Sequence, residues 1–271
     1  MKKETILYHY TNFASFDSIL RNSELRVNNV LNMNDAMEMR LFMQGLCKAV
    51  VKRCKDNGYD KEVEYINNLF KEGLENEYFY SSYAACFSKY RDDAAQWERY
   101  GNGGKGVCIA FDKNGLEKIS KSIASLEKVY YQENIEEHEL VDMFMERIEK
   151  REAIDDLMKE AWICSAAFKH PSFSSENEMR LIVTPFAQDY LNVKPQYHVS
   201  KDRIKKYYPL NLQQMCMDNN AEMKNLIKEI IIGPESNQTI YILQDYLKDT
   251  GYEYLANRVT LSNCPLRRMN L

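Results

Sequence analysis

The first residues of the chain predict a strand followed directly by a helix. Segment 6–11, with the sequence ILYHYT, is rich in β-branched and aromatic residues, which is typical of a strand. Alternation along that strand places Leu7 and His9 on one face and Tyr8 and Tyr10 on the other. Thr11 or Asn12 can cap the following helix, whose apolar residues recur at helical spacing, at Phe13, Phe16, Ile19 and Leu20.

Two longer stretches of helical periodicity interrupt the strands. After a short strand and loop at 24–35, Asp35 and Glu38 have the spacing of a capping box. They open a predicted pair of helices that together fill about 35–78, as an insertion between strands. A second, mainly helical stretch is predicted at about 135–170.

The remaining pattern predicts short strands separated by turns and by two shorter helices. We expect strands at AACFS (84–88), VCIAFD (107–112), LEKVYY (126–131), NEMRLIVTP (177–185, stopped by Pro185) and near YLANRVTLS (254–262). The last third also contains the segments IKKYYPLNL (204–212) and IKEIIIGP (227–234). Shorter helices are expected around 92–100 and 238–249. No internal repeat, low-complexity tract or linker divides the chain, so we expect a single α+β domain over residues 1–271.

Composition indicates which partners, which compartment and which kinds of site can be expected. The net charge of −4 gives no global basic field that would recruit nucleic acid or an anionic membrane. No apolar run approaches the length needed to cross a bilayer, and the N-terminus lacks the features of a signal peptide, so a cytoplasmic protein is expected. The seven cysteines form no Cys-x-x-Cys, and the four histidines are far apart, which favours free thiols and no metal site. Arg267 and Arg268 are expected in a solvated tail.

A glycine-rich segment, YGNGGKGV at 100–107, raises the question of a phosphate-binding loop. The Walker pattern requires Gly-Lys followed by Ser or Thr, between a strand and a helix. Here Gly106 follows Lys105, and the segment leaves a predicted helix and opens a predicted strand. We therefore interpret it as a helix C-cap followed by a turn, and expect Lys105 to contribute nothing to nucleotide binding.

The segment SSENEMRLIV offers a pair of carboxylates. In an extended strand, Glu176, Glu178 and Arg180 would share one face, with Met179 and Leu181 on the other. Projecting carboxylates could stabilise a developing positive charge. The simpler interpretation, which the sequence alone favours, is a solvent-facing strand with a weak surface ion pair. Similarly, helix packing is the favoured interpretation of Trp97 and Tyr100, although aromatic side chains also form the walls of ligand pockets.

Taken together, these segments resemble a widespread bacterial family catalogued as domain of unknown function 2971. The resemblance rests, in order, on LYHYTNFASFDSIL, NMNDAMEMR, CFSKYRDDAAQWERYGNGGKGVCIAFD, KVYY, SENEMRLI, IKEIIIGP and LSNCPLR. It spans nearly the whole chain. The family label supplies no activity, although several members lie in settings similar to those of phage-defence or stress genes.

A weaker resemblance is to the ADP-ribosyltransferase superfamily, whose site is read from an early, a middle and a later strand. His9 and Thr11 match the early strand, Ser88 the middle strand, and Glu176 with Glu178 the later Glu-x-Glu. The resemblance implies a split β-sheet that binds NAD as co-substrate, with His9 on a ribose hydroxyl and Glu178 as the catalytic carboxylate. The chain departs from the pattern, because Glu-x-Glu normally accompanies an early Arg and a Ser-Thr-Ser strand.

These features lead to two alternative functions. The first is an NAD-using ADP-ribosyltransferase-like enzyme or NAD glycohydrolase. Its catalytic residues would be Glu178 and His9, and its ligand-binding residues His9, Tyr10, Thr11, Ser88, Trp97, Tyr100, Glu176 and Arg180. The second is a non-catalytic nucleotide-sensing or protein-interaction module that keeps the pocket. In the enzyme, His9 and Glu178 must face one cleft, and Glu178→Gln is expected to preserve folding while abolishing turnover.

Overall fold

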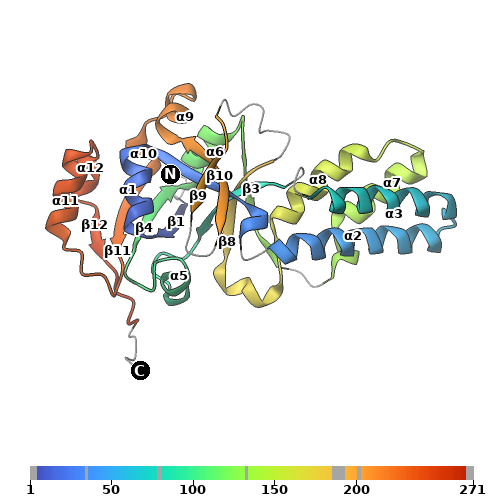
Figure 1. Cartoon of the computed structure of the whole chain (residues 1–271), viewed down its shortest axis with the longest axis horizontal. Coiled ribbons are helices and arrows are strands. Elements are labelled where there is room, and N and C mark those ends of the chain that lie inside the picture. The colour runs from blue at the N-terminus through green and yellow to red at the C-terminus, as the bar shows by residue number, and fades with distance from the viewer. Residues whose placement is uncertain are drawn as a thin grey trace.

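Most of the strands form one large mixed sheet, with a group of helices packed at one end, in a computed structural model of the chain (Figure 1). The structure describes residues 5–33, 36–77, 81–131, 134–184, 193–199 and 203–266. The predictions for Asp35, for the stop at Pro185 and for Arg267 and Arg268 lie outside these residues. The α+β class is confirmed.

The strands are β1 (Ile6–Thr11), β2 (Glu24–Asn29), β3 (Tyr83–Ser88), β4 (Val107–Asp112), β5 (Ser125–Lys128), β6 (Tyr130–Tyr131), β7 (Phe168–Lys169), β8 (Glu178–Val183), β9 (Gln196–Val199), β10 (Ile204–Asn211), β11 (Ile227–Ile232) and β12 (Val259–Leu261). The helices are α1 (Phe13–Arg21), α2 (Ala36–Asp56), α3 (Asp60–Glu75), α5 (Ala94–Arg99), α6 (Lys113–Ser120), α7 (Glu139–Lys150), α8 (Asp155–Ala166), α9 (Leu212–Asp218), α10 (Met223–Leu226), α11 (Ile240–Asp249) and α12 (Glu253–Ala256). Short 3₁₀ helices lie at Val30–Asn32, Ile135–Glu137 and Pro171–Glu176.

The main sheet branches at β3. Its strands run in the order β12-β11-β4-β1-β3-β2-β10-β9, and β8 pairs with the other edge of β3 and then with β5. Neighbouring strands of this sheet are antiparallel except for β11 and β12, which are parallel. Because one edge of β3 serves both β1 and β2, these two strands meet β3 at different points along its length.

Each face of the sheet packs against its own set of helices. Leu7, Phe87 and Leu181 belong to a core that also contains residues of α1, α6, α9 and α11. On the other face, Ala84 and Ile182 pack against α2, α3, α7 and α8. These four helices lie together at one end of the molecule, far from α11 and α12 (Figure 1). The two predicted helical segments, distant in sequence, therefore form one group.

Local sequence explains most element boundaries. Asn12 caps α1, its side-chain oxygen accepting from the Ser15 amide at 2.8 Å, and Asp93 caps α5 in the same way. The helix α6 was not predicted, since its Asn114-Gly115 pair is typical of a turn. Here Asp112 instead accepts from the Gly115 amide at 2.7 Å and starts the helix.

Two predicted elements are corrected by the structure. The predicted strand LEKVYY is divided at Val129, because β5 pairs with β8 whereas β6 pairs with β7. The predicted helical stretch to residue 170 ends at Ala166, and Phe168 and Lys169 form β7. The short strand β7 places Lys169 beside β8, where the carboxylates of Glu176 and Glu178 lie.

Candidate functional site

Residues of several strands line one cavity of about 420 Å³. Directly paired residues of antiparallel strands carry their side chains on the same face of a sheet. Tyr8 pairs with Ser88, and Ser88 pairs with Glu178. Asn28 pairs with both Ala84 and Tyr207. These registers bring β1, β2, β3, β8 and β10 to one face, opposite the main core.

The cavity lies where the sheet divides along one edge of β3. Strand β1 pairs with β3 at one position, Tyr8 with Ser88. Strand β2 pairs with β3 at two positions, Asn28 with Ala84 and Asn29 with Tyr83. Within the described residues, no partner in β1 or β2 is registered opposite the stretch between, 85–87, and these residues line the cavity. Where a strand has no partner along one edge, its backbone N–H and C=O groups can contact a ligand. In a continuous sheet these groups are hydrogen-bonded to the neighbouring strand.

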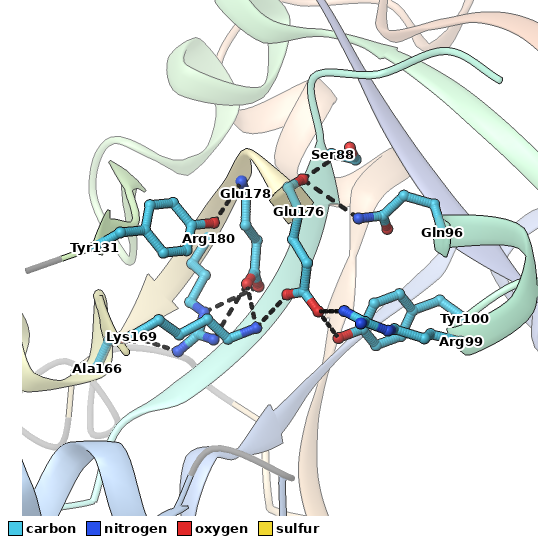
Figure 2. Close-up of polar contacts among 10 residues, drawn as sticks. All are labelled: Ser88, Gln96, Arg99, Tyr100, Tyr131, Ala166, Lys169, Glu176, Glu178 and Arg180. Atoms are coloured by element: carbon cyan, nitrogen blue, oxygen red, sulfur yellow. Dashed lines mark hydrogen bonds and ion pairs between the residues drawn. The ribbon is translucent and has the colours of Figure 1, made fainter. Parts of the chain in front are cut away.

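Two glutamates and three cations form the polar centre of the site (Figure 2). The Lys169 ammonium lies between the carboxylates, 2.5 Å from Glu176 Oε2 and 2.8 Å from Glu178 Oε2. Arg180 pairs with both oxygens of Glu178, at 3.0 and 3.3 Å. On the other side, Glu176 Oε1 accepts from Arg99 at 2.7 Å and from the Tyr100 hydroxyl at 3.1 Å.

This cluster is almost entirely removed from water. Glu176, Glu178, Lys169 and Arg180 are each 5% exposed or less. Burial alone would raise the pKa of the Glu178 carboxyl, but the positive charges of Arg180 and Lys169 outweigh it and lower that pKa to about 2. Glu178 is therefore ionised at neutral pH, with its charge compensated.

The solvent-facing interpretation of this strand is wrong. Glu178 and Arg180 share a face of β8, as alternation predicted, but both are buried because the helices α2, α3, α7 and α8 pack on that face. Glu176 is not part of the strand. It ends a 3₁₀ helix, and Asn177 turns the chain with a left-handed backbone (φ 42°) before β8 begins.

Side chains from β3 and α5 hold that turn in place. The Ser88 hydroxyl donates to the Glu176 carbonyl at 3.1 Å and accepts from the Tyr90 amide. The Gln96 side chain donates to the same carbonyl at 3.3 Å (Figure 2). Ser88 does line the cavity, as a ligand-binding residue would, yet its hydroxyl already makes two internal hydrogen bonds that position the carboxylates.

His9 reaches the cavity from the opposite face of the sheet. Alternation places it beside Leu7, and its ring lies 5.6 Å from that of Phe87. Its Nδ1 lies 2.9 Å from the Cys86 carbonyl oxygen. Since a carbonyl only accepts, Nδ1 carries the proton and Nε2 is left as an acceptor. Burial lowers the pKa of His9, partly offset by this hydrogen bond, so the ring is neutral at pH 7.

His9 and Glu178 line the same cavity, which is the geometric condition set by the sequence. The two are linked through Cys86. Its carbonyl contacts His9, and its thiol is hydrogen-bonded to the Glu178 carboxylate, which further lowers the carboxylate pKa. The site therefore spans both faces of the sheet at the point where it divides.

Comparison of the chain with known proteins gives a match to a protein family. Residues 96–181 match the family model described as "Protein of unknown function (DUF2971)". The matched segment supports the first resemblance seen in the sequence. No curated protein and no solved structure matches the chain.

The DUF2971 segment contains the whole carboxylate cluster. It begins at Gln96 in α5 and ends at Leu181 in β8. It thus includes Arg99, Lys169 and both glutamates, whereas His9, Ser88 and Cys86 lie before it. The cavity is built jointly by that segment and by strands outside it.

The other predicted ligand-binding residues have different positions. Thr11 and Tyr100 line the cavity. Tyr10 lines it too, but its hydroxyl donates to the Tyr90 carbonyl at 2.8 Å and accepts from the Asp93 amide. Trp97 is fully buried beside Tyr10 and Cys108 and is not among the lining residues, so the structure does not bring it to the cavity. Arg180 is likewise not among the lining residues, and it holds Glu178 instead.

Sequence reasoning missed the residues that tie the site together. Lys169 carried one signal, a lone lysine after the apolar run in AAFKHP. Cys86 was expected only as one of the free thiols, and Arg26 carried no signal. Within the described residues, no group of three His, Cys, Asp or Glu side chains could hold a metal ion. Nor is any described helix long and apolar enough to cross a membrane.

After Tyr100, the rest of the glycine-rich segment (101–107) is not among the residues that line the cavity, and it connects α5 to β4, as interpreted from the sequence. Its amides donate within the molecule, with Gly104 N to Trp97 O at 3.0 Å and Gly106 N to Gly101 O at 2.8 Å. Gly106 must be glycine for a packing reason, because a Cβ there would lie 2.1 Å from the Thr11 carbonyl oxygen. The segment fixes the end of β1 next to the site.

Proposed function

We propose that the protein binds NAD or a related nucleotide in the cavity and acts as an ADP-ribosyltransferase-like enzyme, transferring ADP-ribose or hydrolysing NAD. The observation that carries this proposal is that three positions from three strands, His9, Ser88 and Glu178, line one cavity where the sheet divides. These are the positions that the superfamily resemblance singled out. The volume of about 420 Å³ lies in the range of small-molecule sites.

The chemistry requires a negative charge beside the nicotinamide ribose. When the bond from C1′ to the nicotinamide nitrogen breaks, the bonding pair leaves with nicotinamide and positive charge develops on the ribose. A preorganised carboxylate stabilises that charge by several kcal/mol. Glu178 is ionised, and its carboxylate is fixed by Arg180 and Lys169. Water or an acceptor side chain then adds to C1′ and loses a proton.

His9 would position the ribose. Its Nε2 is an acceptor that can receive a hydrogen bond from a ribose hydroxyl, because the Cys86 carbonyl fixes the tautomer. Tyr100 would form part of the wall, with its ring on the cavity and its hydroxyl on Glu176.

One observation favours a second function, a non-catalytic nucleotide-sensing module. The charge of Glu178 is already compensated by two cations, which weakens its effect on a developing positive charge. In that case the cavity would bind the nucleotide and leave it intact. A role in phage defence or stress response is compatible with both functions.

The first prediction concerns His9. His9→Ala removes the acceptor that holds the ligand and is expected to raise the Kd for NAD roughly tenfold, as loss of one hydrogen bond to a buried partner does. Calorimetric titration measures the Kd, with thermal stability recorded in parallel.

His138→Ala is the matched control. His138 is also a buried histidine, but it caps α7 in the helical group, accepting from the Leu140 amide at 3.2 Å. This variant should lose stability and keep its affinity for NAD. If His9→Ala changes stability alone, or if the wild type binds no NAD, His9 is a packing residue and the proposal fails.

A further inference from the structure

The cavity has a second wall, formed by β2, β10 and β9, that the proposed chemistry does not use. Arg26, Lys205 and His198 line it. Pairing places these residues on one face, since Lys205 is opposite His198 and Pro209 is opposite Arg26 in adjacent strands. The wall contains two cationic side chains, Arg26 and Lys205, and an imidazole, His198, from three strands.

Arg26 is held rigidly on this wall. Its Nε donates to Glu24 at 2.9 Å, one Nη donates to the Ser18 hydroxyl at 3.1 Å, and its guanidinium lies 4.8 Å from the Tyr207 ring centroid. These contacts leave its second Nη for a ligand. A guanidinium fixed in this way presents donors without losing side-chain entropy on binding.

Among the described residues, no carboxylate pairs with Lys205. Each lining carboxylate already has a cation, Glu24 with Arg26, Glu176 with Arg99 and Lys169, and Glu178 with Lys169 and Arg180. Within the described part of the chain, the side chains of Lys205 and the adjacent His198 make no hydrogen bond or ion pair. The cavity thus has excess positive charge in a protein whose net charge is −4, and such a cavity attracts anions.

We infer that this wall is a phosphate subsite, where Lys205 and Arg26 bind the diphosphate of a nucleotide whose other end lies at Glu178. The inference rests on the proposed function for the orientation of the ligand. Phosphate matches the donors, because a guanidinium and an ammonium bind its oxygens by charge-assisted hydrogen bonds. His198, exposed beside Lys205, adds a ring nitrogen that can donate a further hydrogen bond.

Charge reversal at Lys205 tests the subsite. Lys205→Glu is expected to raise the Kd of ADP-ribose roughly tenfold or more, because it places a like charge against the phosphates. Inorganic pyrophosphate should lose affinity to a similar degree, and adenosine, which has no phosphate, should bind unchanged. Calorimetry of the three ligands measures these effects. Lys105→Glu, on the glycine-rich segment outside the cavity, is the matched control and should change none of them.

The results separate this inference from the proposed function. If NAD is bound but never cleaved, while Lys205→Glu still weakens ADP-ribose and pyrophosphate, the subsite stands and the enzyme proposal falls. Equal losses for adenosine and ADP-ribose, or none for any ligand, overturn the subsite whatever happens to NAD. Binding of neither ADP-ribose nor pyrophosphate by the wild type overturns it as well.

Discussion

Replacing Glu178 by glutamine is expected to lower the free energy of unfolding by about 3–5 kcal/mol, because it breaks a buried ion pair with Arg180. This revises the expectation from the sequence alone that the variant would fold normally. Arg180 is 2% exposed and forms a two-pronged pair with Glu178. Once that carboxylate is neutral, the Ala166 carbonyl remains to accept from the guanidinium but carries no full charge. Urea unfolding of both proteins measures the difference.

Two further variants show whether burial is the cause. Glu146→Gln breaks the Glu146–Lys150 pair on the exposed side of α7 and should leave stability unchanged. Glu178→Gln combined with Arg180→Gln removes both charges and should recover most of the lost stability. If Glu178→Gln unfolds at the wild-type urea concentration, the pair is not buried and the site as described is wrong.

In the wild-type protein, the same ion pair should make the free energy of unfolding decrease at low pH. The pKa of Glu178 is lowered from 4.5 to about 2, so its stabilising effect is complete above pH 4.5. It is lost progressively as the pH falls from 4.5 toward 2, where the folded state is finally protonated. The variant that lacks both charges should show a smaller loss over that interval.

The second large effect concerns turnover. In the charge-balanced variant, Glu178→Gln with Arg180→Gln, nicotinamide release from NAD is expected to fall at least about 100-fold, the usual cost of losing one preorganised electrostatic group. The Lys169–Glu176 pair remains in place, so the cavity keeps its shape. The initial rate of nicotinamide release, measured at saturating NAD, reports the loss.

Two outcomes of that assay would count against catalysis by Glu178. A variant that folds normally and releases nicotinamide at the wild-type rate would remove Glu178 from the chemistry. A wild type that binds NAD tightly and releases no nicotinamide would favour the sensing module. Lys105→Ala serves as the control variant, since it is expected to keep the wild-type affinity for NAD and the wild-type rate of nicotinamide release.

Local patterns predicted most of the elements, for a clear physical reason. The strand at 6–11 and the cap at Asn12 depend on neighbouring residues alone, and both were confirmed. Leu7 and His9 do share a face, because alternation is a property of any strand. The helices at 36–56 and 60–75 follow from apolar spacing in the same way.

The burial of Glu178 could not be predicted from its neighbours. Glu178 and Arg180 alternate with apolar residues, which resembles a strand with one solvated face. The covering helices come from residues 36–75 and 139–166, far away in the chain. Lys169, which neutralises the carboxylates, comes from β7, a strand too short to leave a periodic signal.

The division of the sheet is also a non-local property. It depends on β1 and β2 pairing with opposite ends of one edge of β3. The sequence of a single strand does not indicate its register with a strand far away in the chain. For this reason the sequence could list His9 and Glu178 as partners but could not show that they approach from opposite faces. Nor could it show the cationic wall of Arg26 and Lys205.

A structure determined after soaking with NAD tests the central claim most directly. We expect the nucleotide in the cavity where the sheet divides, with a ribose hydroxyl on His9 Nε2, the nicotinamide ribose beside Glu178, and the diphosphate against Lys205 and Arg26. An empty cavity at NAD concentrations that saturate the crystals, or NAD bound elsewhere on the molecule, would contradict it.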